Sequence, residues 1–397
     1  ILIGTVIAYT AAYLNRLNLS AALSGVMEAF SISASTAGLL QTAFASIYAA
    51  GQLVNGAIVD KISPVRHLLI GLIGSGLCNL FMGFSPSFGF FIAMCMLNGA
   101  FQSMLWTPIV RLFALCFHTE QQRGKANFIH SFALVIGHFC AWAISGFLID
   151  TVGWQLSFIV PAMVMAPVVI SVFIYLQPVQ NIDANTTTHA DKRGNEATVQ
   201  AFYALAATGF FLILISSVLY GFVRDGIITW APEILRKLTD DSALSATAFS
   251  LIIPAINAVG VWLGYCLIRR GDRNTRKMIA YMNFACVGFC MFLPASPNVL
   301  LAALLMGLSC ASLFGLNPLL TTLVPLEYDK IGRTGLTAGL IDSFIYMGSA
   351  LAGVIDGGIY EKSGLNALYL TWILSGLAGT IAVYLSGTRH SIQALND

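Results

Sequence analysis

Apolar segments, each about as long as a lipid bilayer is thick, follow one another along almost the whole of this 397-residue chain. A helix needs roughly 20 apolar residues to cross the hydrocarbon core. Polar or glycine-rich breaks separate twelve such segments, while charged residues make up 10% of the sequence and hydrophobic residues 57%. A soluble domain carries about 25% charged residues, so this chain has too few to cover a surface that faces water. These features predict an all-α polytopic membrane protein with twelve transmembrane helices.

The twelve predicted helices form two groups of six. They cover residues 1–26, 35–60, 66–85, 88–116, 122–149 and 154–177, and then 199–234, 243–269, 276–293, 297–325, 331–359 and 364–387. The longest polar stretch separates the groups, so we predict a six-helix bundle at 1–177, a linker at 178–198, and a second six-helix bundle with a short tail at 199–397. Because the chain opens within an apolar run without a methionine, we expect the sequence to begin inside the first helix of a longer product.

Lys and Arg residues are distributed unevenly over the predicted loops. The linker, the tail and the other loops on their side of the membrane hold fourteen of them, whereas the loops on the opposite side hold three. Loops rich in Lys and Arg stay on the cytoplasmic side of a membrane. The distribution therefore predicts that the linker and both termini are cytoplasmic.

Composition also narrows the classes of function. The net charge of +2 is too small to indicate a nucleic-acid partner, and the eight cysteines are scattered among apolar runs. None of them belongs to a Cys-x-x-Cys motif or has a histidine at the spacing of a zinc site. The polar residues lack the Ser/His, paired-acid or metal-binding arrangements of an enzyme. We predict no catalytic residue, no metal and no cofactor, and a monomer whose partners are a small anionic substrate and the lipid bilayer.

The two halves of the chain repeat each other. Arg16 precedes Gly56 by 40 residues, and Arg224 precedes Gly264 by the same interval. Transporters built from two related halves carry such internal repeats, and their substrate site lies between the halves. The matching intervals therefore favour a transporter.

Three of the twenty Lys and Arg residues, namely Arg16, Arg111 and Arg224, lie more than three residues from either end of a predicted helix. An arginine at the bilayer centre costs about 2.5–3.5 kcal/mol on insertion scales. Because Arg16 and Arg224 occupy matching helices, we expect both to face a central cavity and bind an anion. The alternative for each is an ion pair with a neighbouring helix, which is the interpretation we favour for Arg111. Tyr9 and Tyr13 share a helix face with Arg16, as the wall of a pocket would.

Two acidic residues and one histidine are also predicted to lie within the membrane. Asp225 adjoins Arg224, and Asp342 lies in the middle of the eleventh predicted helix. For each carboxylate two interpretations stay open, an ion-pair partner or a proton carrier. His130, in the fifth predicted helix, can bind substrate or a proton, or have a structural role in the core.

The loop between the second and third predicted helices reads Gly56-Ala-Ile-Val-Asp60-Lys61-Ile-Ser-Pro-Val-Arg66. It resembles the loop signature of the major facilitator superfamily, a glycine followed by an aspartate and several basic residues. The resemblance implies the fold of that superfamily, and it implies that Gly56, Asp60, Lys61 and Arg66 form a conformational latch. The matching loop of the second half has Ile268 where the aspartate would fall.

Three further motifs resemble the organophosphate:phosphate antiporter family of that superfamily. They are Tyr13-Leu-Asn-Arg16, Trp106-Thr-Pro108-Ile-Val-Arg111, and Val223-Arg224-Asp-Gly-Ile-Ile-Thr-Trp230-Ala-Pro232-Glu233. The resemblance spans nearly the whole chain and implies secondary active transport at a bacterial inner membrane, where an organophosphate exchanges for phosphate by alternating access. It implies that Arg16 and Arg224 clasp the phosphate, since an arginine can bind two oxyanion oxygens at once. The other substrate-binding residues are then Tyr9, Tyr13, Tyr48, Gln52, Trp106, His130 and Tyr346.

The chain departs from this family at several matched positions. Gln52 stands where the family has a pocket lysine, Leu134 where it has a histidine, and Thr229 where it has an aspartate. Two arginines alone suit a phosphate of charge near −2, and such a charged site has to carry an anion in both directions. If Asp225 and Asp342 are ionised, they neutralise the arginines, and the site can then reorient across the membrane without a substrate. We therefore retain a proton-coupled symporter of a carboxylate or zwitterion as the alternative, and a non-transporting sensor of sugar phosphate as a less favoured one.

Overall fold

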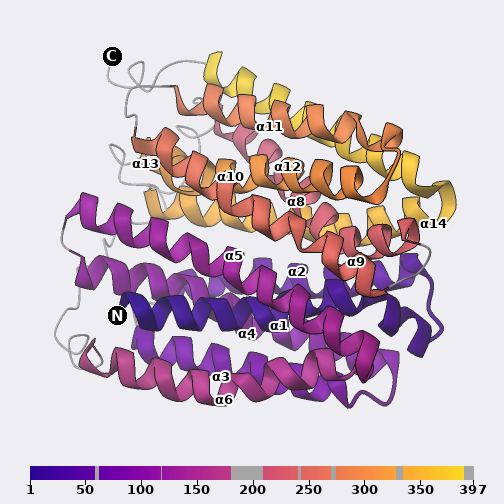
Figure 1. The fold of residues 1–397 in the computed structure, drawn as a ribbon. Helices are drawn as coiled ribbons and strands as arrows, with labels where there is room; N and C mark the ends of the chain where they lie inside the picture. The colour runs from indigo at the N-terminus through magenta and orange to yellow at the C-terminus, as the bar shows by residue number, and fades with distance from the viewer. Residues whose placement is uncertain are drawn as a thin grey trace.

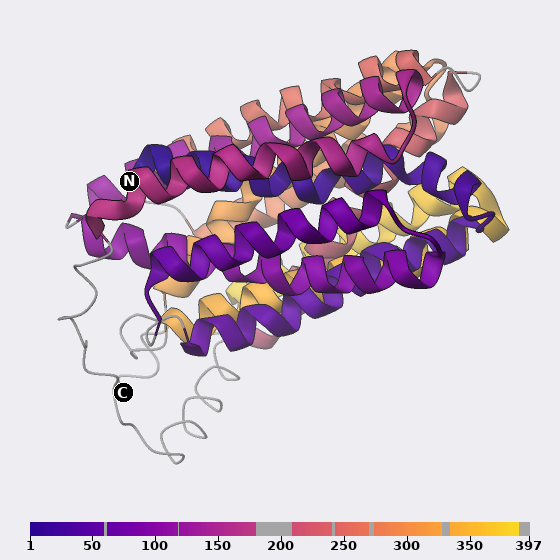
Figure 2. The same ribbon diagram turned by 90° about the horizontal axis from the view of Figure 1, so that it is seen from below.

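The computed structural model describes residues 1–58, 62–117, 119–179, 209–239, 243–269, 274–327 and 334–388. Within these ranges the chain is almost entirely helical and contains no strand. The long helices run side by side along one axis, as Figure 1 and the view from below in Figure 2 show. Nine helical segments of the described ranges are long and apolar enough to cross a membrane.

The first half consists of six long helices. They are α1 (Leu2–Ala29), α2 (Ala34–Ile58), α3 (Pro64–Gly83), α4 (Phe88–Cys116), α5 (Glu120–Thr151) and α6 (Leu156–Leu176). Each begins and ends within three residues of its predicted bounds. Local signals explain this agreement, because Pro64 occupies the first position of α3 and the Ser87 side chain caps the start of α4. Thr119 and Gln122 form a capping box at the start of α5.

The second half contains more interruptions. Its described elements are α8 (Phe210–Leu238), α9 (Ala243–Ser250), α10 (Ile252–Arg269), α11 (Thr275–Met291), the 3-10 turn η3 (Leu293–Ala295), α12 (Val299–Pro318), the π-helical turn η4 (Leu319–Leu323), α13 (Val324–Leu326) and α14 (Thr334–Thr388). The predicted helix at 243–269 is divided into α9 and α10, because Pro254 has no N–H with which to continue the hydrogen-bond ladder. The last two predicted helices are both part of α14, and Gly364, with a φ of 77°, joins them.

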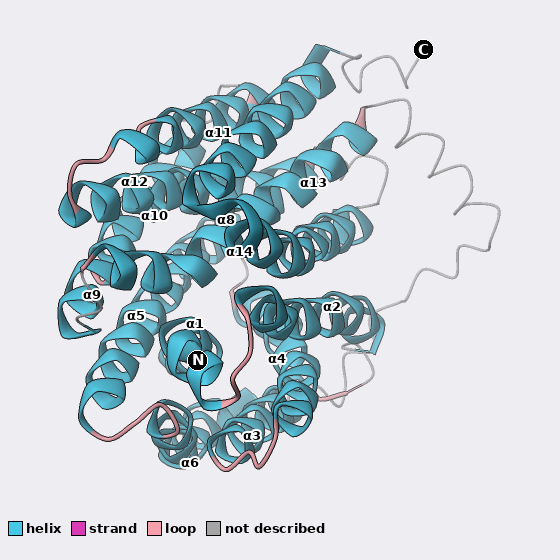
Figure 3. Ribbon diagram, turned by 90° about the vertical axis from the view of Figure 1, so that its right-hand side faces the viewer, coloured by secondary structure: helices cyan, strands magenta, loops and turns pink. Residues whose placement is uncertain are grey.

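The helices form two six-helix bundles that lie against each other. In Figure 1 the first half (indigo to magenta) lies below the second (rose through orange to yellow). The halves meet where α1 contacts α8, α2 contacts α14, and α5 contacts α9 and α10. Figure 3 shows α2 beside α14 and α5 beside α9. The predicted linker falls mostly on residues 180–208, outside the described ranges, so its bounds and those of the two bundles stay a prediction.

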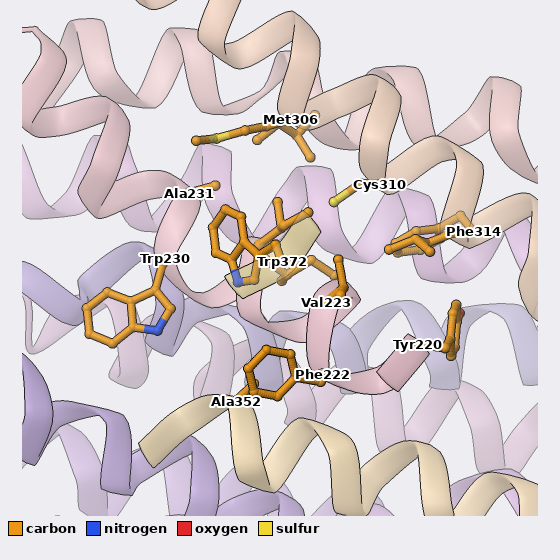
Figure 4. Close-up of a cluster of buried hydrophobic side chains, with 14 of the residues drawn as sticks. Tyr220, Phe222, Val223, Trp230, Ala231, Met306, Cys310, Phe314, Ala352 and Trp372 are labelled. Carbon is orange, nitrogen blue, oxygen red and sulfur yellow. The ribbon is translucent and has the colours of Figure 1, made fainter. Parts of the chain in front are cut away.

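A buried apolar core holds α8 in place. Val223, Trp230 and Trp372 are each at most 1% exposed. Figure 4 shows Trp372, Met306 and Cys310 gathered around α8, and all three belong to the same buried cluster. Helices in a membrane associate chiefly through such close packing. The packing therefore fixes the direction in which α8 presents the side chain of Arg224.

Backbone contacts close one end of the interface between the halves, which we call the α2–α14 seam. A Cβ added to Gly38 would overlap the carbonyl oxygen of Gly353, and one added to Gly353 would overlap that of Gly38. Beside this contact, the hydroxyl of Thr42 donates to the carbonyl oxygen of Ala350 at 2.6 Å. Where α2 begins, the N–H of Ser35 donates to the carboxylate of Glu361 at 2.8 Å. The seam thus ties the halves together at the end opposite to the start of α1.

Candidate anion site between the halves

Arg16 lies in the middle of α1 and is surrounded by aromatic rings. Its Nη1 donates a hydrogen bond to the hydroxyl of Tyr346 in the other half, at 3.1 Å. The centre of its guanidinium lies 5.0–5.6 Å from the ring centroids of Tyr13, Phe44, Tyr48 and Tyr346, a distance at which cations bind ring faces. In the described part of the chain, no carboxylate forms an ion pair with Arg16.

Arg224 lies in the middle of α8 and already has a carboxylate partner. Its Nε and Nη2 donate to the two carboxylate oxygens of Asp225, at 2.7 and 2.9 Å. Its Nη1 donates to the hydroxyl of Tyr220 at 3.1 Å, and that hydroxyl donates to Oδ1 of Asn317, also at 3.1 Å. Both side chains of the ion pair are 12% exposed, so the pair is largely shielded from water. A fork-shaped contact of this kind is the strongest that an arginine makes.

Tyr346 connects the two arginines. Its ring centroid lies 5.0 Å from the guanidinium of Arg16 and 6.0 Å from that of Arg224. It also lies 4.1 Å from the ring centroid of Tyr48, whose hydroxyl accepts a hydrogen bond from Gln52 at 2.8 Å. The structure therefore brings five predicted site residues into one chain of contacts that crosses from one half to the other.

A cavity of about 30 Å³ lies between the two arginines. Tyr13 and Arg16 of the first half line it together with Tyr220, Arg224 and Asp225 of the second. The cavity holds about two water-sized groups, so a larger ligand would have to push the halves apart. The arrangement can bind an oxyanion, since two guanidinium groups, one from each half, line one space.

Tyr9, Trp106 and His130 form a separate aromatic cluster beside Tyr13. Their ring centroids lie 4.7–5.8 Å apart, and the ring of Tyr9 lies 5.2 Å from that of Tyr13. His130 is 1% exposed, and neither of its ring nitrogens has a hydrogen-bond partner. The three residues therefore lie together, but none of them lines the cavity between the arginines. The rings in direct contact with the arginines belong to other residues.

Asp342 is half-buried on α14 and lies close enough to interact electrostatically with Arg16 and Arg224. It forms no ion pair among the described residues. For each acid the sequence left two interpretations open, an ion-pair partner or a proton carrier. Within the described ranges, Asp225 is an ion-pair partner and Asp342 is not.

The predicted latch falls largely outside the described residues. Asp60 and Lys61 are not described, and Gly56 lies near the end of α2. Arg66 is exposed in the first turn of α3. The latch stays a prediction.

Three residues that contact the arginines or their partners were not predicted from the sequence. Tyr220 lies one helical turn before Arg224, so its spacing on the helix could have identified it. Phe44 and Asn317 lie on other helices, and only the packing of the bundles brings them to the site.

Comparison with known proteins supports the relationship that the fold suggests. The model of the major facilitator superfamily matches residues 3–353. The phosphoglycerate transporter protein of Salmonella typhimurium is 24% identical over 390 residues, which cover 91% of this chain and 83% of that protein. The glycerol-3-phosphate transporter of Bacillus subtilis is 24% identical over 412 residues, with coverages of 97% and 91%.

A solved structure has the same fold. It is a bacterial homologue of the human lysosomal transporter Spinster in an inward-facing, occupied conformation, with a TM-score of 0.70 and 16% identity. The match covers 98% of this chain and 94% of that one. The family model matches most of the chain, and the relatives named above are transporters. Together with the fold, these matches indicate a transporter rather than an enzyme. This integral membrane protein belongs to the major facilitator superfamily of transporters.

Proposed function

We propose that this protein carries a small organic anion across a bacterial inner membrane by alternating access, and that a phosphate ester exchanging for inorganic phosphate is its physiological cargo. One observation carries the proposal, the placement of Arg16 and Arg224, one from each half, on a single cavity. Two guanidinium groups offer enough N–H donors for the three terminal oxygens of a phosphate ester. The two relatives named above are transporters of phosphoglycerate and of glycerol 3-phosphate, which are both phosphate esters.

The mechanism follows from the position of the site between two rigid bundles. Arg16, which has no carboxylate partner among the described residues, is the first contact for the anion, and Arg224 then joins as the halves close around it. The halves rock about this point, so that the site faces one side of the membrane and then the other. The α2–α14 seam closes one side and must separate in the other conformation. We place the termini in the cytoplasm on the basis of the Lys/Arg distribution, and we expect a monomer to be sufficient.

Exchange in proteoliposomes tests this function. Vesicles that contain the purified full-length chain and unlabelled phosphate receive labelled phosphate outside. Uptake that requires phosphate inside, and that glycerol 3-phosphate inhibits, is the expected result. Lys362→Ala, which removes an exposed cation far from the site along α14, is the matched control for Arg16→Ala. The proposal would be refuted if vesicles without internal phosphate, or vesicles with Arg16→Ala protein, took up as much labelled phosphate as phosphate-loaded vesicles with the wild-type protein.

A second candidate is proton-coupled symport of a singly charged anion such as a carboxylate. The bidentate Arg224–Asp225 pair favours it, because it lowers the net charge of the site in the absence of substrate. The same vesicles distinguish the two candidates. An imposed pH gradient drives net uptake by a symporter, whereas it leaves one-for-one phosphate exchange unchanged.

A further inference from the structure

A second cavity of about 70 Å³, which we call the inner cavity, lies next to the arginine pair. It shares Arg16 and Asp225 with the smaller cavity between the arginines. From there it extends along α1 as far as Leu23 and along α8 as far as Thr229. It therefore leads from the arginine site toward the end of the molecule at which α1 and α8 end.

A third cavity, which we call the outer cavity, begins within one helical turn of the inner one and measures about 30 Å³. Ala21 and Ser24 of α1 and Pro232 and Arg236 of α8 line it, together with residues of α5 and α9. Three residues of a helix span about 4.5 Å, so the step from Thr229 to Pro232 is short. The cavities thus follow one another along the interface of α1 and α8, and the outer cavity lies nearest to the helix ends.

One hydrogen bond marks the boundary between the inner and outer cavities. Trp142 of α5 lines the outer cavity, Ser20 of α1 lines the inner one, and Nε1 of Trp142 donates to Oγ of Ser20 at 2.9 Å. One turn further along α5, a Cβ added to Gly146 would overlap the side chain of Thr247 on α9, so the halves are in close contact beside the outer cavity. The cavity holds about two water-sized groups. A phosphate therefore fits only after the halves separate at this end.

Positive charge exceeds negative charge beside the outer cavity. Nε and Nη2 of Arg236 donate to the carboxylate of Glu233 at 3.2 and 3.4 Å, and Nζ of Lys237 lies 4.0 Å from the same carboxylate. Two cations thus share one acid, whose side chain is 2% exposed, whereas that of Arg236 is 28% exposed. Ser24 and Thr247, which carry hydroxyl groups, lie on the same wall as Arg236. A surplus cation beside hydroxyl donors is a combination that binds oxyanions.

We propose that the outer cavity is an access site, at which Arg236 binds the transported anion before it reaches Arg16 from this end of the molecule. The hydrogen bond between Trp142 and Ser20 closes the step between the two positions. The inference rests on the proposed function, since it assigns the same small oxyanion to both positions. It applies to the conformation in which the halves are apart at this end, because only then does the outer cavity have room for an anion.

Phosphate exchange measured from each side of the membrane tests the access site. Right-side-out and inverted membrane vesicles from the same cells, each loaded with unlabelled phosphate, present opposite ends of the protein to labelled phosphate. Vesicles from cells without the protein give the background. We expect Arg236→Gln to raise the half-saturating phosphate concentration about five-fold in one vesicle type and by less than about two-fold in the other, since it removes one partly exposed hydrogen-bonding cation. Arg236→Lys, which keeps the charge, should recover most of the loss.

Lys237→Gln is the matched control. Lys237 lies in the same last turn of α8, shares the carboxylate of Glu233 and carries the same charge as Arg236. Its ammonium lies 4.5 Å from the ring centroid of Tyr360 on α14, and it does not line the outer cavity. A general effect of charge at this end would raise the half-saturating concentration equally in both variants, whereas the access site requires Arg236.

Thiol labelling gives a readout that does not depend on transport. Ser24→Cys places a thiol on the wall of the outer cavity, where an anionic and a cationic methanethiosulfonate reagent of similar size compete for it. Protein with Ser24 unchanged gives the background from the native cysteines. We expect the anionic reagent to react about five-fold faster, and Arg236→Gln, but not Lys237→Gln, to remove this preference. If Arg236→Gln does not fold, Ser24→Cys alone still tests the proposal, because equal rates of the two reagents would overturn it.

The outcomes separate the access site from the proposed function. Losses of equal size in both vesicle types, or in Arg236→Gln and Lys237→Gln alike, overturn the access site and leave the arginine site intact. Wild-type protein that takes up no more phosphate than the background in either vesicle type overturns the proposed function, and the access site with it.

Discussion

Arg16 and Arg224 occupy matching positions in the two halves, yet their surroundings differ. Arg16 is held by aromatic rings and one neutral hydroxyl, whereas Arg224 is held by a carboxylate through two hydrogen bonds. The repeat has therefore kept the cation in both halves but has neutralised it in only one. In chemical terms, the first half offers an open anion-binding group and the second half offers one that an internal anion occupies.

The difference indicates an order of events. In the proposed mechanism, an incoming anion meets no competitor at Arg16, but at Arg224 it must displace or share the carboxylate of Asp225. Opposite charges in a shielded site interact strongly, and an unpaired charge there is costly. The carboxylate of Asp225 can thus take the place of the substrate anion on Arg224 while the site is empty. The following predictions test this asymmetry.

Removal of either arginine should have the largest effect on transport. Arg16→Ala and Arg224→Ala are each expected to lower phosphate exchange by about 100-fold, since a charge-assisted hydrogen bond contributes about 1.5–3 kcal/mol. Exchange rates in proteoliposomes measure this loss. Wild-type rates in either variant would remove that arginine from the site.

The two alanine variants should differ in stability. Arg224→Ala leaves Asp225 buried without a cation and should destabilise the protein by about 3–5 kcal/mol, whereas Arg16→Ala leaves no carboxylate unpaired. Thermal unfolding in detergent measures the difference. The double variant Arg224→Ala, Asp225→Asn should recover most of the loss, and equal stability of the two single variants would contradict the asymmetry.

Asp225→Asn should make the two halves more alike. The amide keeps the size of the side chain but loses its charge, so Arg224 becomes available to the substrate. We expect phosphate to bind about ten-fold more tightly, and transport to depend more strongly on phosphate at the opposite side. Inhibition curves and net efflux from loaded vesicles measure the two effects. Unchanged affinity would indicate that the anion never contacts Arg224.

Tyr346→Phe should have a smaller effect, because it removes only the hydroxyl that accepts the hydrogen bond from Arg16. The ring remains, and with it the contacts to both guanidinium groups. The loss of one hydrogen bond corresponds to about 1 kcal/mol, or about a five-fold change in affinity. Tyr346→Leu, which also removes the ring, should bind phosphate more weakly than Tyr346→Phe does. If the two variants bind phosphate equally well, the ring contributes nothing to the site.

Much of the fold could be predicted because its signals are local. Lengths of apolar segments, Pro64 at a helix start and the capping box at Thr119 all lie within a few residues of the ends they define. The divided helix at 243–269 was missed, although Pro254 was a local signal for it.

The site could be predicted only in part. Arg16, Arg224 and Asp225 could be singled out as candidates because charges are rare in apolar helices, and the structure places them on one cavity. Phe44 and Asn317 could not, since they lie on other helices and only the packing of the bundles brings them to the site. Outside the candidate site, Asp356 was also not predicted. It is fully buried in the core of the second half, where Trp372 donates to it at 3.0 Å.

The smallest effect is expected far from the arginines, at the α2–α14 seam. There the second half supplies the anion and the first half the donor, because Glu361 accepts a hydrogen bond from the backbone N–H of Ser35 in the first turn of α2. Negative charge at a helix N-terminus is favourable, but the contact is exposed and weak. Glu361→Gln should therefore shift the population toward opening at this end by about two-fold or less. Spin labels attached to Glu28→Cys and Lys362→Cys, both exposed at this end, would report the shift as a longer distance between the labels. The control is the same doubly labelled protein with Glu361 unchanged. A large shift would mean that the seam, rather than the arginine pair, sets the balance between the two conformations.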